Sequence, residues 1–344
     1  MPKLFRLSLR PIKNLSNMSK YNVKVGVIGG SGLYKLEGIE VVGTENVDTP
    51  WGATSSPITI GKLPSGVHVA FLARHGLSHQ HSPSNVPVLA NISALKSLGV
   101  RAIIAFSAVG SLREEIAPKD FVVPSQIIDR TKGIRRASFF GEGNEKGVVA
   151  HAGFGDPFDE KLRSVVEEIV RKTLKEKAPA VKTHGNKTVV CMEGPAFSTR
   201  AESNMYRQWG GDIINMSVLP EAKLAREAEL AYVLIATGKN CACKSKALPL
   251  TPSLLSATDY DAWREHSAAV NVAEVLEALK SNVVASNQVT LAVLDHVNAL
   301  VADDASEVNK ANKGAMKFSI MTKPEAIPAT ARNNLRFVLP EYFS

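Results

Sequence analysis

The sequence has few cysteines and no long apolar run. Only three of its 344 residues are cysteines, Cys191, Cys241 and Cys243. They form no Cys-x-x-Cys motif and no cluster with histidine, which argues against a disulfide framework and a zinc site. No apolar run approaches the roughly 18 residues that a membrane-spanning helix needs. We therefore expect a protein of a reducing, intracellular setting, with no metal and no membrane segment.

Acidic residues are absent from two segments, and these segments account for the whole net charge of +8. Residues 1–21 contribute +5, and residues 238–256 contribute +3. The rest of the chain is therefore electrically balanced. A balanced body argues against nucleic acid as a partner.

The first 21 residues form a basic extension, and two interpretations of it stay open. It has the composition of an organelle transit peptide, for example a mitochondrial one. Alternatively, it precedes a second start at Met18, because "MSKYNVKVG" leads directly into the first predicted strand. In either case we expect it to be disordered or absent from the native protein.

Short β-branched segments alternate with longer helical patterns in the rest of the chain, which predicts an α/β fold. Strands are predicted at 23–29, 67–73, 101–106, 188–192, 212–216 and 231–236. Helices are predicted at 85–99, 160–176, 200–210, 220–229 and 271–280. No repeat or low-complexity linker divides the chain. We therefore predict one domain over 22–321 and a C-terminal tail at 322–344.

Polar or glycine-bearing segments follow most of the predicted strands. They are Gly29–Gly32, Arg74–Gly76, Ser107–Ser111, Glu193–Pro195 and Ser217. In open α/β sheets, ligands bind at the carboxyl ends of the strands. Packing alone does not require polar groups at so many strand ends, so this pattern predicts a binding site.

The residue types at these strand ends suit an anion. Gly29–Gly32 can turn backbone N–H groups toward an anion, although a simple tight turn is the alternative. Arg74 matches phosphate oxygens with its planar fork, and a structural pair with an acid is its alternative. Ser107 and Ser217 add hydroxyl donors. One arginine, several hydroxyls and no metal ligands predict a site for free phosphate rather than for a magnesium nucleotide.

Two common nucleotide motifs do not fit the glycine-rich segment. The glycine spacing of the dinucleotide fingerprint is missing, and so is the Gly-Lys-Ser/Thr of a P-loop. This argues against a nucleotide-dependent dehydrogenase.

Seven stretches in the order of the chain together resemble the trimeric purine nucleoside phosphorylase and methylthioadenosine phosphorylase family, in particular its methylthioadenosine branch. They are "GVIGGSGL", "VDTPWG", "LARHGLSHQHSPSNV", "AVGSLREEIAPKDFVVPSQIIDRT", "MEGPAFSTRAE", "INMSVLPEAKLAREAELAY" and "ATDYDAWREH". The resemblance implies a single-domain α/β fold with a mixed, twisted sheet of barrel-like distortion, flanked by helices. It also implies a homotrimer with active sites near the subunit interfaces. The expected location is the cytoplasm, with the nucleus as a second one.

The resemblance assigns contacts to individual positions. The phosphate contacts fall on Ser31, Arg74, His75, Ser107, Ala108 and Ser217. Serine stands at three of these positions where the branch often has threonine, and it keeps the hydroxyl. Met216 falls where a methionine contacts the ribose, and Phe197 where an aromatic ring packs against the base.

The branch assignment depends on residues around the base and the 5′ group. Asp259 and Asp261 are the implied catalytic and base-binding pair, because a carboxylate accepts from the adenine 6-amino group. Ser198 stands where the guanine and hypoxanthine branch has glutamate. Val272 stands where that branch has a histidine for the 5′-hydroxyl, so it favours a methylthio group.

Two further positions are implied to line the 5′ pocket. They are His151, reaching in from a neighbouring subunit, and Met321. The implied reaction is phosphate-dependent cleavage of S-methyl-5′-thioadenosine to adenine and 5-methylthioribose 1-phosphate, in purine and methionine salvage. Phosphate is a co-substrate and no cofactor is expected. Asp259 is implied to share a proton with the purine N7.

Residues 238–256 interrupt the family pattern just before the aspartate pair. Deleting them joins "AYVLIAT" to "ATDYDAW" and restores the family spacing. We interpret them as a retained intron, since the flanking residues can be encoded with splice signals; a genuine surface loop is the alternative. The insertion also leaves open an inactive paralogue. A phosphorylase for inosine or guanosine is the other alternative function.

Overall fold

The computed structural model describes residues 20–30, 37–141, 147–237, 259–263 and 283–344. The strands are β1 Val23–Gly29, β2 Glu40–Glu45, β3 Ile58–Lys62, β4 His68–Ala73, β5 Ala102–Ala108, β6 Gly110–Ser111, β7 Phe121–Val123, β8 Gln126–Arg130, β9 Thr183–Gly185, β10 Thr188–Met192, β11 Ile213–Asn215, β12 Ala231–Thr237 and β13 Asp259–Tyr260. The helices are η2 Pro83–Asn85, α1 Val88–Ser97, α2 Glu160–Lys177, α3 Arg200–Gln208, α4 Val218–Glu227, α6 Val283–Ala302, α7 Glu307–Asn312, η3 Pro324–Ala326, α8 Ala329–Val338 and α9 Pro340–Phe343.

The larger sheet of the described residues has eight strands in the order β2-β3-β4-β1-β5-β12-β7-β9. Its centre is parallel: β1 pairs with β4 and β5, and β5 pairs with β12. The pairs β2–β3, β3–β4 and β7–β12 are antiparallel. The sheet is therefore mixed, as expected, and its parallel strands bring their carboxyl ends to one edge.

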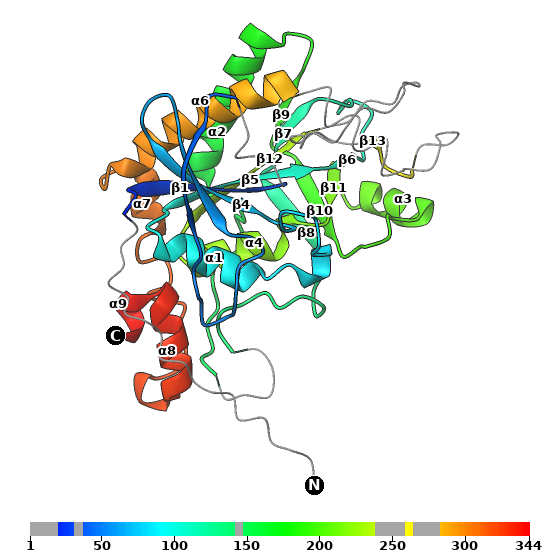
Figure 1. Cartoon of the computed structure of the whole chain (residues 1–344). Coiled ribbons are helices and arrows are strands. Elements are labelled where there is room, and N and C mark those ends of the chain that lie inside the picture. Colours follow the sequence, from blue (N-terminus) through cyan, green and yellow to red (C-terminus); the bar gives the residue numbers. More distant parts are fainter. Residues whose placement is uncertain (1–19, 31–36, 142–146, 238–258, 264–282) are drawn as a thin grey trace.

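Helices cover both faces of this sheet (Figure 1). Successive residues of the central strands alternate between two cores, so Ile103 packs with α1, α4 and α8, and Ile104 with α2 and α6. Because both faces of these strands are buried, their sequences are continuous apolar runs. This burial on both sides fixes the strand ends on which the site is built.

A second, five-stranded sheet has the order β13-β6-β11-β10-β8. It joins the larger sheet through the chain itself, because β5 ends at Ala108 and β6 begins at Gly110. Two of its members, β6 and β13, are only two residues long. This short sheet places the end of β11 and the strand of Asp259 beside the end of β5.

The predicted α/β class is confirmed, and the six predicted strands correspond to β1, β4, β5, β10, β11 and β12. Four predicted helices correspond to α1, α2, α3 and α4; the fifth, 271–280, lies outside the described residues. The strands β2, β3, β6, β7, β8, β9 and β13 and the helices α6, α7, α8 and α9 were not predicted. None of the helices in the described ranges is long and apolar enough to cross a membrane.

The segment 322–344, which we predicted as a C-terminal tail, contains η3, α8 and α9. Leu335, Val338 and Phe343 belong to the same core as α1 and α4. Residues 1–19 and the inserted segment 238–256 lie outside the described ranges, and the domain bounds stay a prediction.

Candidate active site

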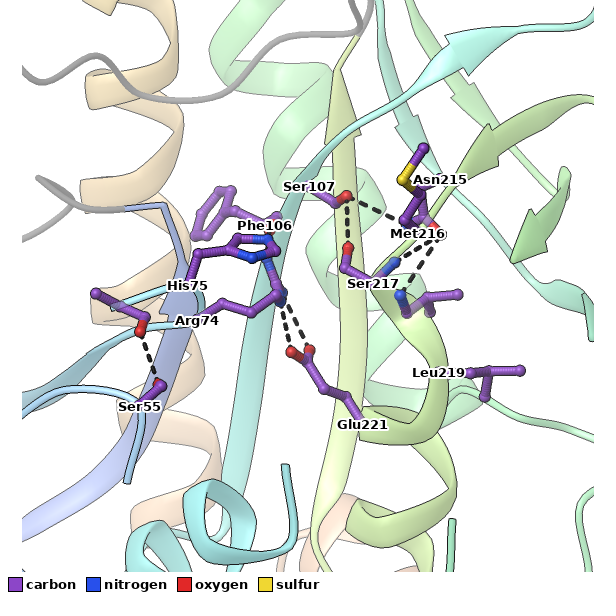
Figure 2. A network of polar contacts seen from close by, with 12 residues as sticks. Ser55, Arg74, His75, Phe106, Ser107, Asn215, Met216, Ser217, Leu219 and Glu221 are labelled. Carbon is purple, nitrogen blue, oxygen red and sulfur yellow. Dashed lines mark hydrogen bonds and ion pairs between the residues drawn. The ribbon is translucent and has the colours of Figure 1, made fainter. Parts of the chain in front are cut away.

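Arg74 follows β4 directly and is buried, with 4% of its surface exposed. Its Nε and Nη2 atoms donate to the two carboxylate oxygens of Glu221, at 2.5 and 3.0 Å, and Nη1 donates to the Phe106 carbonyl at 2.9 Å. Burial acts to lower the pKa of Arg74, but the Glu221 carboxylate outweighs it and the pKa is raised. The guanidinium therefore keeps its charge and a fixed orientation (Figure 2).

The two alternatives for Arg74 are compatible in this geometry. A guanidinium has five N–H groups, and three of them are used in the contacts with Glu221 and Phe106. Within the described part of the chain, the other two have no recorded partner. Arg74 thus forms the structural ion pair with an acid, Glu221, and still has two N–H groups that can donate to an anion.

Ser107 and Ser217 are brought together from the ends of different strands. Their hydroxyl oxygens lie 2.9 Å apart, and Figure 2 shows them facing each other. Asn215 supports the pair, because its Nδ2 donates to the Ser107 Oγ at 3.2 Å. The Asn215 Oδ1 also accepts, at longer distance, from the backbone N–H groups of Ser217 and Val218. Asn215 therefore holds two hydroxyl-bearing residues at one place.

Arg74 and the serine pair belong to the same locus. Arg74 contacts the carbonyl of Phe106, the residue before Ser107. Glu221, its carboxylate partner, lies four residues after Ser217. The backbone N–H of Arg74 donates to the Gly29 carbonyl at 2.8 Å, so the glycine-rich segment begins next to it. The predicted phosphate contacts that the structure describes thus converge, as the strand-end rule implies.

His75 and Ala108 are the other predicted phosphate contacts among the described residues. The Nδ1 atom of His75 lies 2.8 Å from the His81 carbonyl, and its ring stacks on His79 at 4.5 Å. Burial lowers the pKa of His75 to about 4, with the positive charge of Arg74 adding to the effect. His75 is therefore neutral at physiological pH. Ala108 is the last residue of β5, and its carbonyl accepts from the Ser107 hydroxyl at 3.0 Å.

The aspartate pair lies beside the same strand end. The backbone of Asp259 pairs with Gly110, and the Asp261 N–H donates to the Ser111 carbonyl at 3.0 Å. The indole N–H of Trp263 donates to that carbonyl as well, at 2.9 Å. Residues 259–263 are thus attached to the segment that starts at Ser107.

Asp261 is a buried carboxylic acid, with 4% of its surface exposed. Its Oδ2 accepts a hydrogen bond of 2.5 Å from the Ser203 hydroxyl on α3. Burial raises the pKa of Asp261, and the bond from Ser203 opposes this in part. Such a group holds a proton more readily than an ordinary carboxyl and can share it with a base.

The predicted ribose and base contacts surround a turn after β10. Gly194 has a φ of +75°, and a Cβ placed on it would lie 2.5 Å from the Met216 sulfur, so the methionine packs on the bare backbone. Phe197 is 45% exposed. Ser198 is buried, and its hydroxyl contacts the Met192 sulfur at 3.3 Å. An exposed ring beside a buried serine leaves the Phe197 face open to a ligand.

His151 and Met321 are adjacent in the structure, although no recorded contact within the described residues links them to the phosphate cluster. The His151 N–H donates to the Ser319 carbonyl, and the Met321 N–H to that of Val149, both at 2.8 Å. Met321 is 64% exposed. Three predicted positions cannot be placed: Ser31 and Val272 lie outside the described residues, and of Asp259 only the backbone is described.

Sequence reasoning missed Glu221, Asn215, Ser203 and Arg135. Glu221 reads in the sequence as one acid among many on a charged helix, and only a structure reveals its pairing with Arg74. A signal existed for Asn215, since a polar residue at the end of an apolar strand is unusual in a core.

One pocket of about 200 Å³ lies behind the predicted contacts, on the side of Arg135, which hydrogen-bonds the Met216 carbonyl. It is lined by η2, the start of α1, Trp51, Arg135, Arg136 and Pro220. It shares no residue with the predicted site. Among the described residues no group of His, Cys, Asp and Glu could hold a metal ion.

Comparison with known proteins gives concordant matches. Residues 24–294 match the family model described as the phosphorylase superfamily. The S-methyl-5′-thioadenosine phosphorylase of Mycosarcoma maydis is 64% identical over 92% of this chain and 94% of its own length. That of Yarrowia lipolytica is 48% identical over the whole of both chains.

Solved structures agree. A methylthioadenosine phosphorylase sourced from an antarctic soil metagenomic library is 37% identical, with a TM-score of 0.77 over 92% of this chain and 99% of that one. The methylthioadenosine phosphorylase of Schistosoma mansoni in complex with adenine is 33% identical, with a TM-score of 0.74 over 87% and 99%. With its fold, its strand-end cluster and these matches, the chain belongs to the S-methyl-5′-thioadenosine phosphorylase family of the phosphorylase superfamily.

Proposed function

We propose that this chain uses inorganic phosphate to cleave S-methyl-5′-thioadenosine, giving adenine and 5-methylthioribose 1-phosphate. The main observation in support is that three groups meet at residues 106–111. Arg74 contacts Phe106, Ser217 contacts Ser107, and the strand of Asp259 pairs with Gly110. Relatives that are 48–64% identical over most of the chain bear the name of this activity. Phosphate is the co-substrate, and the reaction belongs to purine and methionine salvage.

Phosphate binds, in this proposal, between the remaining N–H groups of Arg74 and the serine pair. Because Glu221 fixes the guanidinium, the donors are arranged before the anion arrives, which lowers the cost of binding. Ala108, His75 and Ser31 are assigned to the same phosphate. His75 is neutral here, so it contributes hydrogen bonding rather than charge.

The chemistry exchanges one bond at the anomeric carbon for another. The bond from C1′ to N9 breaks, and its electron pair stays on adenine while the ribose gains positive charge. Phosphate on the opposite face stabilises that charge and then bonds to C1′ through one oxygen. Proton sharing with N7 makes adenine a better leaving group. We assign this proton sharing to Asp259, and we assign Asp261 to the 6-amino edge, where its carboxyl oxygen accepts a hydrogen bond from the amino group.

Specificity depends on the residues around the base and the 5′ group. Phe197 packs on the base, Met216 contacts the ribose, and Ser198 leaves room where an acid would favour 6-oxo purines. Val272 makes the 5′ pocket apolar. We further propose that Met321 lines the 5′ pocket and that the protein is a homotrimer in which His151 reaches this pocket from a neighbouring subunit. The exposure of both side chains in the single chain supports this. The cytoplasm and the nucleus remain the proposed locations.

The test is the release of adenine from S-methyl-5′-thioadenosine with and without phosphate, compared with the release of hypoxanthine from inosine. The proposal predicts phosphate-dependent adenine release and at least about tenfold slower cleavage of inosine, since a hydroxyl is poorly matched to an apolar pocket. A preference for inosine would favour the alternative substrate.

A second preparation without residues 238–256 separates a natural loop from a retained intron. If only the shortened protein is active, the insertion is not part of the working enzyme. If neither preparation is active, an inactive paralogue is favoured.

A further inference from the structure

We propose that Arg135 is a positioning residue of the active site, whose guanidinium joins the two chain segments that present Met216 and Ser217 on one side and the turn before Phe197 on the other. The inference rests on the proposed roles of Met216 and Ser217. Arg135 lies in the loop after β8 and would not contact either substrate itself.

The contacts of Arg135 use all five of its N–H groups. Nη1 donates to the carbonyls of Met216 and Leu219 at 2.6 and 2.7 Å. Nη2 donates to the Glu193 carbonyl at 2.7 Å and, more weakly, to that of Met192 at 3.4 Å. Nε donates to the Glu193 carboxylate at 2.9 Å. One buried cation thus binds the chain after β10 and the chain after β11.

The segment after β11 needs this support because it is not a regular helix. Leu219 has extended dihedral angles, φ −112° and ψ 142°, inside α4, and Pro220 has no N–H to donate. The carbonyls of Met216 and Leu219 are turned to Arg135 instead. Because Ser217 lies between them, its hydroxyl and backbone N–H are placed by the same contacts.

The segment after β10 is held by the same group. The Glu193 carboxylate accepts from Arg135 and from the Ser84 hydroxyl of η2. Gly194 follows, and its bare backbone carries the Met216 side chain. A shift of either segment would therefore change the position of Met216 relative to the ribose and that of Ser217 relative to the phosphate.

Lysine cannot substitute for this arginine. Its ammonium has three donors on a single atom, while the planar guanidinium spans several acceptors. We expect Arg135→Lys to leave one or more buried carbonyls without a donor and to displace the two segments. Displacements of about 1 Å near reacting atoms lower turnover by up to about 10²-fold.

The matched control is Arg163→Lys. Arg163 is as buried as Arg135 and is paired with Glu160 and Glu167, but it lies on α2, which packs on β7 and β12 and not on the site. Steady-state kinetics with both substrates and the melting temperature are measured for each variant. We expect R135K to lose at least about tenfold in kcat, with a smaller change in either KM, and R163K to lose less than about twofold.

A folded R135K with kinetics within twofold of wild type would overturn the inference. If R135K is insoluble, Glu193→Gln replaces it, since it weakens one contact and keeps the arginine. A fall in kcat of about threefold or more, at an unchanged melting temperature, then supports the proposal, and unchanged kinetics overturns it.

Ser217→Ala separates this inference from the proposed function. If S217A raises the phosphate KM and R135K is normal, the phosphate site stands and the role of Arg135 is wrong. If S217A is normal and R135K is impaired, the phosphate contact of Ser217 is wrong, and Arg135 acts through Met216.

Discussion

The residues proposed to bind phosphate and those proposed to bind the base are held in different ways. At the anion side, which comprises Arg74, Ser107 and Ser217, every side chain has a polar partner within the fold, and the arginine is neutralised by Glu221. At the base side, which comprises Phe197, Ser198 and residues 259–261, Asp261 is buried with one hydroxyl donor and no ion pair among the described residues.

The anion side is built for a fixed geometry, and the base side keeps a carboxyl that can exchange a proton. A bidentate ion pair fixes the direction of the anion donors, so the phosphate meets a prepared site. A buried carboxyl without a cation has a raised pKa, which costs stability while it is ionised but suits proton sharing. Loss of an anion-side residue should therefore cost both stability and activity, and loss of a base-side residue activity alone.

The largest effect is expected for Arg74→Met. The substitution removes the proposed main phosphate donor and leaves the Glu221 carboxylate buried without its cation. We expect activity to fall by more than about 10³-fold and stability by about 3–5 kcal/mol. Phosphorolysis rates and urea unfolding measure the two effects.

The double variant Arg74→Met/Glu221→Met is the control. With both charges gone, stability should recover most of the loss, while activity stays low. A double variant as unstable as the single one would contradict the ion-pair explanation. Recovered activity would remove Arg74 from phosphate binding.

Asp261→Asn should show the opposite combination at the base side. We expect turnover to fall by about 10²-fold or more, because an asparagine at the base edge suits 6-oxo purines rather than the adenine 6-amino group. The melting temperature at pH 7.5 should be unchanged or higher, because a buried carboxylate is replaced by a neutral amide.

The stability gained by Asp261→Asn depends on pH in a predictable direction. The folded pKa of Asp261 is raised above its unfolded value, so the native state binds the proton more tightly. The stability of the wild type therefore increases relative to D261N as the pH falls toward that pKa. The excess of the melting temperature of D261N over that of the wild type should therefore shrink on acidification. An excess that grows as the pH falls would contradict the raised pKa.

Ser203→Ala should have a smaller effect, because it removes only the hydroxyl that donates to Asp261. The carboxylate loses a stabilising donor, so its pKa rises further. We expect a change of about three- to tenfold in kcat at neutral pH and a shift of the acidic limb of the pH–rate profile to higher pH. A profile that does not move would separate Ser203 from the titration of Asp261.

The smallest effect is expected for His75→Gln, measured as stability against pH. The folded pKa of His75, about 4, lies below the ordinary 6.5, so its contribution is present above pH 6.5 and is lost as the pH falls toward 4. Between pH 6.5 and 5 the wild type should lose up to about 2 kcal/mol more than the variant. Equal acid sensitivity in urea unfolding would show that His75 protonates normally in the native state.

The anion side could largely be anticipated from the sequence, because it follows from strand ends. The strands β4 and β5 both pair in parallel with β1, so Arg74 after β4 and Ser107 in β5 lie at the same edge of the sheet. The contact of Ser107 with Ser217 did not follow from this rule, because Ser217 comes after β11, which belongs to the second sheet. Their roles toward phosphate stay predictions.

The supports of the site could not be anticipated. Arg135 contacts residues up to 84 positions away, and Glu221 lies 147 positions from Arg74. Long-range pairs between charged side chains leave no periodic pattern in the sequence. The strands β6 and β13 are too short for an alternation of apolar and polar residues to mark them.

A crystal structure of the protein with adenine and phosphate tests the central claim most directly. We predict phosphate within hydrogen-bonding distance of the Arg74 guanidinium and the Ser107 and Ser217 hydroxyls, with adenine between Phe197 and Asp261 and room for a ribose between the two ligands. Phosphate bound elsewhere, or adenine separated from it by more than the width of one ribose, would contradict a shared site at these strand ends.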